Sequence, residues 1–213
     1  MSQFETVSAT QAYREKCEDQ VAVFTTESRT VVVVADGAGG TGDGEAAALA
    51  VIREIENEYL SIHSAIEWVS LLRQVDCRIG VGETTAVVVD IRSIGLAGAS
   101  VGDSRAVLID DGNMKELTVQ QNRKPLLGSG RAEPVGFVSS SLTGVLVVAT
   151  DGFFNYAKPR EIQKLIATSN FQALPRLCIE MVRLPSGGFW DDVGIAAVRK
   201  RPRSSTRKRF TIE

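Results

Sequence analysis

The sequence predicts an α+β fold in which helices flank antiparallel sheets. Two observations lead to this prediction. Short apolar runs rich in β-branched residues follow one another across turn signals, and helical patterns come in pairs, so that the order is strands, two helices, strands, two helices, strand. No regular strand–helix alternation or internal repeat runs through the chain, and 213 residues suit one well-filled core better than two. We therefore expect one domain with layered helices and sheets.

The first half of the chain predicts a hairpin followed by two helices. Apolar runs at 21–24 and 29–35 are separated by the turn-like Thr26-Glu27-Ser28, and the second run, RTVVVVA, lacks a polar face, which predicts complete burial. From Asp43 or Gly44 the apolar residues recur at three and four spacings up to Leu60, and a second helix is expected over 64–79. The two helices should pack as a pair on one face of a sheet.

The second half is dominated by strand signals. They lie at 84–91, 94–100, 104–109 and 114–119, with Asp111-Gly112-Asn113 as a hairpin turn, which predicts an antiparallel meander. Residues 120–136 are rich in Gly, Pro and charge and are expected to form a surface loop. A buried strand at 145–150, helices at 159–168 and 171–183, and a last strand at 193–198 complete the expected order.

Composition excludes several classes of protein. A hydrophobic fraction of 44% and a charged fraction of 23% are ordinary for a globular protein. No apolar run approaches the 18 residues of a membrane span, and residues 1–20 lack the order of a signal peptide, so we expect a cytoplasmic protein without a membrane partner. The three cysteines, at 17, 77 and 178, form no CxxC or Cys/His cluster and are expected to be reduced thiols.

The charge is unevenly distributed. Seven of the 24 basic residues lie between Arg199 and Arg209, which leaves 17 basic against 25 acidic side chains in residues 1–198. An acidic body is poorly suited to a polyanion, so nucleic acid is not an expected partner. Two interpretations of the basic tail, residues 201–213, stay open: a solvated terminus, or a contact with nucleic acid.

Carboxylates recur at the ends of buried strands. Asp36 follows TVVVVA, Asp151 follows VLVVAT, and Asp191 precedes VGIAAV. A sheet can bring such positions together, and like charges gathered at one rim are either neutralised by cations or serve as turn caps. One Asp-Gly dipeptide usually marks only a turn, but three matched positions favour a metal site. Oxygen ligands without His or Cys favour Mg²⁺ or Mn²⁺, and Gly37 allows its own carbonyl to approach an ion.

Five segments in order carry a resemblance to a known family. VVVVADGAGG, GETTAVVV, VGDSRAVLI, LVVATDGFF and WDDVGIAAV resemble the metal-dependent serine/threonine protein phosphatases of type 2C, the PPM-type phosphatases, and the chain looks like a small bacterial-like single-domain member. The early arginine of that family, followed by an acidic pair, is matched by Arg14 and Glu18-Asp19. The resemblance runs from about Tyr13 to Val198. It implies an antiparallel β-sandwich flanked by helix pairs, in four layers, within one domain over residues 1–200.

The resemblance also implies a ligand set for two divalent cations, Mn²⁺ or Mg²⁺. Asp36 would bridge the two ions and the Gly37 carbonyl would bind one of them. Asp151 and Asp191 would bind the other ion, and Glu18 would contribute mainly through metal-bound water. Two cations roughly 3.5 to 4 Å apart can activate a water nucleophile, so no Ser, Cys or His nucleophile is needed. The one histidine, His63, is expected to be solvated.

The remaining implied roles concern the substrate. Asp19 would act through metal-bound water as a catalytic residue, and Arg14 would grip the substrate phosphate with its planar guanidinium. The alternative for Arg14 is a surface ion pair with Glu18, four residues on. The implied partners are phosphorylated proteins and an opposing serine/threonine kinase. A pseudophosphatase that binds phosphoproteins without turnover is the alternative function, against which the intact aspartates argue.

The chain departs from the family pattern at a few positions. Ala38 stands where some members carry a histidine, so water would have to protonate the leaving oxygen. Asn122 is the nearest match to an aspartate that in many members holds a further metal, which argues against a third ion. The short loop from 120 to 144 predicts a small flap. We assign no catalytic role to the 102–105 turn or to 84–85, which we expect to begin a strand on the far side of the core.

Overall fold

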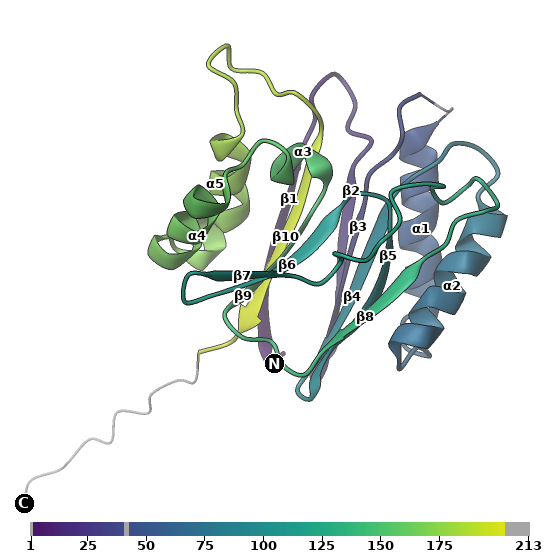
Figure 1. The fold of residues 1–213 in the computed structure, drawn as a ribbon, viewed down its shortest axis with the longest axis horizontal. Helices are drawn as coiled ribbons and strands as arrows, with labels where there is room; N and C mark the ends of the chain where they lie inside the picture. Colours follow the sequence, from purple (N-terminus) through teal and green to yellow (C-terminus); the bar gives the residue numbers. More distant parts are fainter. Residues whose placement is uncertain (1, 41–42, 203–213) are drawn as a thin grey trace, which may run out of the picture.

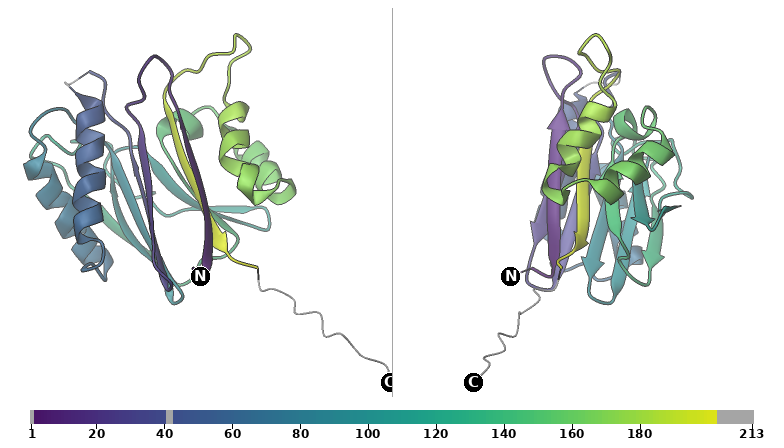
Figure 2. Two further views of the ribbon diagram at one scale, coloured as in Figure 1. Left: turned by 180° about the vertical axis from the view of Figure 1, so that it is seen from behind. Right: turned by 90° about the vertical axis from the view of Figure 1, so that its left-hand side faces the viewer.

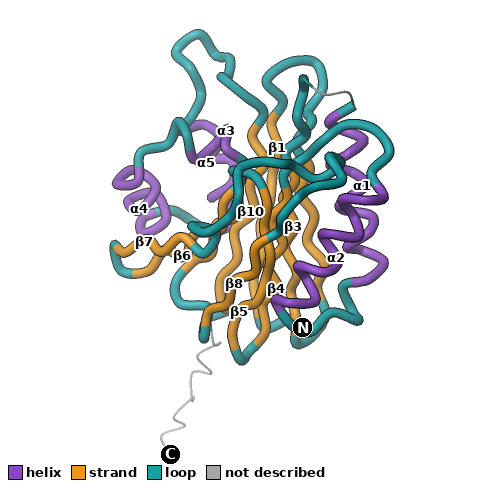
Figure 3. Tube along the Cα trace, turned by 45° about the vertical axis from the view of Figure 1, so that its right-hand side comes forward, coloured by secondary structure: helices purple, strands orange, loops and turns teal. Residues whose placement is uncertain are grey.

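The computed structural model describes residues 2–40 and 43–202 of the chain. Two antiparallel five-stranded sheets stack face to face, and helices cover both outer faces (Figure 1). Figure 3 shows the same arrangement as orange strands between purple helices. The predicted α+β fold with four layers is confirmed.

The first sheet has the order β2-β3-β4-β5-β8. Its strands are β2 (Gln20–Thr25), β3 (Arg29–Ala35), β4 (Ala86–Arg92), β5 (Gly95–Val101) and β8 (Val135–Ser139). Its outer face is covered by α1 (Gly44–Glu58) and α2 (Ala65–Arg78), which Asp43 and Ser64 cap at their N-termini. Every residue of β3 is buried, as predicted, because one face of the strand meets the helices and the other meets the second sheet.

The second sheet has the order β1-β10-β9-β6-β7. Its strands are β1 (Phe4–Gln11), β10 (Val193–Lys200), β9 (Val145–Ala149), β6 (Arg105–Asp110) and β7 (Asn113–Glu116). Its outer face packs against α3 (Asp151–Phe154), α4 (Pro159–Thr168) and α5 (Leu174–Met181), and a 3-10 turn over Phe171–Ala173 leads into α5 (Figure 2). Apolar side chains fill the space between the sheets and both helix–sheet interfaces.

The predicted meander is wrong in one respect, because its four strands belong to two sheets. β4 and β5 form a hairpin in the first sheet, and β6 and β7 form a hairpin in the second. The chain crosses between the sheets at Gly102, which has a φ of +102°, and a Cβ there would lie 2.6 Å from side-chain atoms of Thr85. Strand patterns show that neighbouring segments are extended, but they do not show which sheet each segment joins.

Two strands were not predicted. β8 lies partly within the expected 120–136 loop, where Pro134 and Gly136 obscure a short strand with alternating burial. β1 contains five polar residues in eight and alternates only partly buried positions, so its sequence, FETVSATQ, lacks the apolar run that marked the other strands. Both lie at sheet edges, where one side of the strand needs no protein neighbour.

The last strand is longer than predicted and is tied to the start of the chain. β10 runs to Lys200, which lies opposite Phe4 of β1, and the Arg201 N–H donates to the Gln3 carbonyl at 2.9 Å. Most of the predicted basic tail, from residue 203 onward, lies outside the described residues. In the described part of the chain no helix is long and apolar enough to cross a membrane.

Candidate active site

A cleft of about 1110 Å³ opens at the end of the sandwich where β3 and β9 finish and β10 begins. This end lies opposite the one where β1 begins and β10 finishes (Figure 1). The cleft brings together all seven residues that were predicted from the sequence, from four separate segments: Arg14, Glu18, Asp19, Asp36, Gly37, Asp151 and Asp191.

Asp36 directly follows β3, and two threonines fix its backbone. The Thr85 Oγ1 hydroxyl accepts from the Asp36 N–H at 3.1 Å, and the Thr84 Oγ1 hydroxyl donates to the Asp36 carbonyl at 2.8 Å. Thr85 Oγ1 also lies 2.7 Å from Ser104 Oγ, which links this turn to the crossover after β5. The expectation that residues 84–85 lie on the far side of the core is therefore wrong, because they hold Asp36 in place.

Gly37 allows α1 to approach the turn after β3. A Cβ at Gly37 would lie 2.5 Å from both the carbonyl carbon and the carbonyl oxygen of Gly44, the first residue of α1. The reason for glycine here is therefore close backbone packing. The Ala38 N–H donates to the Glu83 carbonyl at 2.8 Å and fixes the next residue.

Asp151 and Asp191 come from adjacent segments. Asp151 is the first residue of α3, and Asn155 Nδ2 donates to its Oδ2 at 2.9 Å. A Cβ at Gly152 would collide with the carbonyl oxygen of Asp192, so the start of α3 packs directly on the segment that precedes β10. This contact holds the two predicted ligands beside each other.

Asp192 organises the loop that carries Arg14. Its Oδ1 accepts from the Tyr13 N–H and its Oδ2 accepts from the Glu18 N–H, both at 2.6 Å. The carboxylate thus closes the loop between β1 and β2 onto the start of β10. Asp192 lies within the segment WDDVGIAAV but was not predicted to be a site residue.

Burial and mutual repulsion disfavour the charged forms of the site carboxylates. Burial raises the pKa of Asp19 to about 7, with further contributions from Asp192, Asp191 and Asp151, while the Thr150 hydroxyl partly opposes the shift. Burial likewise raises the pKa of Asp36 well above its usual value, with Asp19 and Asp151 as the next causes. Asp19 is 2% exposed, and its Oδ2 has no hydrogen-bond partner among the residues that the structure describes.

The same pattern extends to the outer carboxylates. The pKa values of Glu18, Asp151 and Asp191 are also raised, first by burial and then by neighbouring carboxylates. Other interactions partly oppose these shifts: the neighbouring Asp36 side chain and the positive charge of Arg123 lower the pKa of Asp151, and the Asp192 N–H, which donates to Asp191 Oδ1 at 2.9 Å, lowers that of Asp191.

The donor set fits divalent cations. It consists of oxygens alone, which suits Mg²⁺ and Mn²⁺, and the repelling carboxylates and the unpaired Asp19 oxygen are features that bound cations would relieve. Among residues 2–40 and 43–202, no three acidic, histidine or cysteine side chains already converge as a ligand group. Small side-chain movements and further oxygen ligands would therefore have to complete the coordination.

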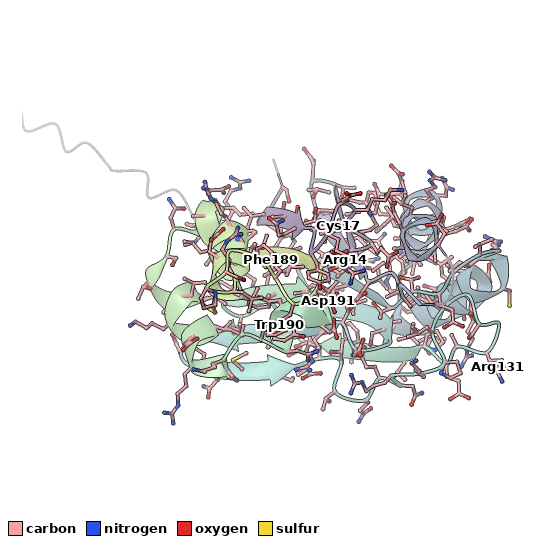
Figure 4. All side chains as sticks on the ribbon, turned by 90° about the horizontal axis from the view of Figure 1, so that it is seen from above. Arg14, Cys17, Arg131, Phe189, Trp190 and Asp191 are labelled. Carbon is pink, nitrogen blue, oxygen red and sulfur yellow. The ribbon has the colours of Figure 1, made fainter. Side chains whose placement is uncertain are left out.

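Cationic side chains also line the cleft. Arg14 is exposed, with its guanidinium carbon 4.9 Å from the centre of the Tyr13 ring. Within the described chain Arg14 and Glu18 form no ion pair, which disfavours the surface-pair interpretation. Looking down on this end, Figure 4 shows Arg14 near Asp191. Lys16 and Lys124 also line the cleft.

A buried carboxylate on α2 fixes the loop that carries Lys124. Asp76 accepts the N–H groups of Gly128 and Gly130 through Oδ1, at 2.7 and 3.0 Å, and that of Ala132 through Oδ2, at 2.9 Å. Three such bonds hold residues 128–132 against α2. The loop is thereby positioned beside the cleft, which Leu126 and Lys124 line.

Asp103 also lines the cleft, although the sequence analysis left it without a role. It forms an ion pair with Arg123 at 2.7 Å. Asn122 does not line the cleft; its backbone carbonyl accepts the Gly102 N–H at 2.8 Å. His63 is exposed, as predicted, and lies near Arg92.

Comparison with known proteins identifies the family that the chain resembles. Residues 51–125 match the family model described as protein phosphatase 2C. The fold is that of the PPM-type serine/threonine phosphatases, so the resemblance seen in the sequence motifs is confirmed. No curated protein sequence shows significant similarity to the chain.

Similar solved structures include three bacterial phosphatases. The serine/threonine phosphatase of S. agalactiae superposes with a TM-score of 0.80 at 18% identity, over 93% of this chain and 100% of its own. Stp1 of Staphylococcus aureus gives 0.77 at 19% identity, over 94% and 96%. MsPP of Mycobacterium smegmatis, solved in complex with cacodylate, gives 0.77 at 19% identity, over 94% and 100%. Identities this low establish a shared fold.

Proposed function

We propose that this protein is a serine/threonine protein phosphatase that hydrolyses phosphate monoesters with two divalent cations bound in the acidic cleft. The observation that carries the proposal is the convergence of buried, mutually repelling carboxylates, with one unpaired oxygen on Asp19, at one end of a phosphatase 2C fold. Carboxylates with only a structural role at a sheet edge would pair with hydrogen-bond donors or face solvent. The carboxylates of the cleft are instead held close to one another.

The residues that would hold the cations follow the sequence-based assignment. Asp36, the Gly37 carbonyl, Glu18, Asp151 and Asp191 would hold them. Bound cations would lower the pKa of an attacking water and offset the negative charge of the transferring phosphoryl group. Because all the ligands are oxygens, the site is compatible with either Mn²⁺ or Mg²⁺.

Arg14 would bind the substrate phosphate. Its guanidinium can donate two parallel hydrogen bonds to phosphoryl oxygens, and the Tyr13 ring beneath it limits the orientations that it samples. Asp192 acts indirectly, because it fixes the backbone on both sides of Arg14. Lys16 and Lys124 would reduce the repulsion between a phosphate dianion and the carboxylates.

Asp19 would orient the nucleophilic water. No donor in residues 2–40 and 43–202 bonds to its Oδ2, so this oxygen is available to accept a hydrogen bond from a water that faces the phosphorus atom. Ala38 supplies no proton at the leaving-group side, so solvent would protonate the leaving oxygen. The partners of such an enzyme would be phosphoproteins and the serine/threonine kinase that produces them. The activity would require residues 1–200 as one domain, since β1 pairs along its length with β10.

The test is phosphate release from a phosphothreonine peptide by metal-stripped protein, with Mn²⁺ and with excess EDTA. We expect turnover only with Mn²⁺, and its loss in Asp151→Asn, while the exposed Asp111→Asn in the β6–β7 turn serves as a matched control. Full activity in EDTA would rule out the cation mechanism. Phosphopeptide binding without turnover under all conditions would instead identify a pseudophosphatase.

A further inference from the structure

Two exposed aromatic side chains stack beside the acidic cleft. The rings of Tyr156 and Trp190 lie 6.3 Å apart between centres and 20° from parallel, with the residues 44% and 61% exposed. Large aromatic residues kept in water lose the free energy that burial would provide, and Trp and Tyr are common where proteins bind partners. We call this pair the aromatic shelf.

The loop that presents Trp190 is held in place by its neighbours. Phe189 is buried, and the guanidinium carbon of Arg183 lies 4.5 Å from the centre of its ring. Arg183 also forms two hydrogen bonds of 2.8 Å with the Glu180 carboxylate and donates to the Gly187 carbonyl at 2.6 Å. Since the residue before Trp190 is anchored in the core, the exposed position of the indole follows from an ordered loop.

Both shelf residues are joined to site residues through short stretches of chain. Trp190 directly precedes Asp191, and Figure 4 shows the two at the same end of the sandwich. Tyr156 follows Asn155, whose side chain donates to Asp151 at 2.9 Å. A peptide whose phosphorylated residue occupies the cleft would therefore pass the shelf with one of its flanking residues.

No arginine in the described part of the chain lies over the rings of Tyr156 or Trp190. Among the described residues five arginines lie over six aromatic rings, those of Tyr13, Tyr59, Trp68, Phe154, Phe189 and Phe171, and none lies on the shelf. The electron-rich faces of Trp and Tyr attract cations, and arginine additionally stacks its planar group on them. Residues 1–198 carry 25 acidic against 17 basic side chains, which adds a favourable field for a cationic peptide.

We propose that the aromatic shelf of Tyr156 and Trp190 selects substrates by stacking on an arginine that flanks the phosphorylated residue, an inference that rests on the proposed phosphatase function. The contact is made with a part of the substrate that does not react. It therefore lowers KM for arginine-containing peptides and leaves kcat nearly unchanged.

The first test compares phosphothreonine peptides with alanine at every flanking position except one, which carries arginine or its neutral planar analogue citrulline. At the preferred position, arginine should lower KM roughly two- to five-fold relative to alanine, as expected for an exposed cation–π contact, and citrulline should not. Trp190→Ala should bring this ratio to about one, and Trp190→Phe should retain part of it. Ile94→Ala, which removes another exposed apolar side chain, should leave the ratio unchanged.

The second test needs no turnover. Trp190 is the exposed member of the two tryptophans, Trp68 being fully buried, so tryptophan fluorescence should change more with the arginine phosphopeptide than with the alanine one, and Trp190→Phe should remove the change. An arginine preference that persists in Trp190→Ala, or its absence from the wild-type protein in both tests, would overturn the proposal. A fluorescence response without any phosphate release would refute the phosphatase function and leave the shelf standing.

Discussion

Replacing Asp19 by asparagine should stabilise the cation-free protein at alkaline pH while reducing its activity. The side chain is buried among carboxylates and its pKa is raised from 3.8 to about 7. A raised carboxyl pKa means that the folded state binds the proton more tightly than the unfolded state. The free energy of unfolding therefore falls as the pH rises from about 3.8 to about 7 and levels off above that window.

The magnitude follows from the size of the shift. Three pKa units correspond to at most about 4 kcal/mol at pH 8, and the neighbouring Asp36 and Asp151 share part of this energy because the groups titrate together. The neutral amide has nearly the same shape and carries no charge to bury. Asp19→Asn should therefore gain roughly 2 to 4 kcal/mol over the wild-type protein at pH 8, or about 4 to 16 °C in Tm, and little at pH 4.

The assay is thermal and urea unfolding followed by circular dichroism, in EDTA, at pH 4 and pH 8. Asp111→Asn, an exposed change of the same kind, should unfold like the wild-type protein at both values. Adding Mn²⁺ at pH 8 should stabilise the wild-type protein more than Asp19→Asn, because the cations remove the repulsion that the variant has already lost. Identical pH dependence of wild type and Asp19→Asn in EDTA would refute this account of the cleft.

Three further variants test separate parts of the site. Arg14→Ala should lower kcat/KM for a phosphothreonine peptide roughly ten- to hundred-fold without changing Mn²⁺ affinity, and Arg14→Lys should recover part of the loss; wild-type kinetics would mean that Arg14 does not bind phosphate. Gly37→Ala should lower the free energy of unfolding by about 1 to 3 kcal/mol and reduce activity, because its Cβ would lie 2.5 Å from the Gly44 carbonyl; unchanged unfolding would show that the turn adapts freely. Deleting residues 203–213 should leave Tm and peptide hydrolysis unchanged, and reduced hydrolysis would assign the tail a role at the site.

Much of the fold could be predicted because its buried elements have strong local patterns. RTVVVVA has no polar face and forms β3, and the segment with three- and four-residue spacing after Asp43 forms α1. The edge strands β1 and β8 could not be predicted in this way, because partial exposure permits polar residues and glycine. The crossover at Gly102 depends on packing against Thr85, which is distant in sequence.

The residues of the candidate site, too, could be predicted only in part from the sequence. Asp36, Asp151 and Asp191 were identified because each adjoins a buried strand, and the structure places all three in one cleft. Asp192 and Thr85 could not be identified, because their contributions are hydrogen bonds to backbone groups that only the folded chain brings near. Their sequence contexts, a second aspartate and a second threonine, resemble ordinary strand termini.

The most direct test of the account is the position of Mn²⁺ in crystals of the protein, measured by anomalous diffraction. We expect two peaks roughly 3.5 to 4 Å apart in the cleft, with Asp36 between them and Asp151 and Asp191 beside one. Coordination distances should be about 2.0 to 2.2 Å, as for small divalent cations with oxygen ligands. Mn²⁺ bound elsewhere, or no peak in the cleft at saturating Mn²⁺, would contradict the assignment of these carboxylates as a metal centre.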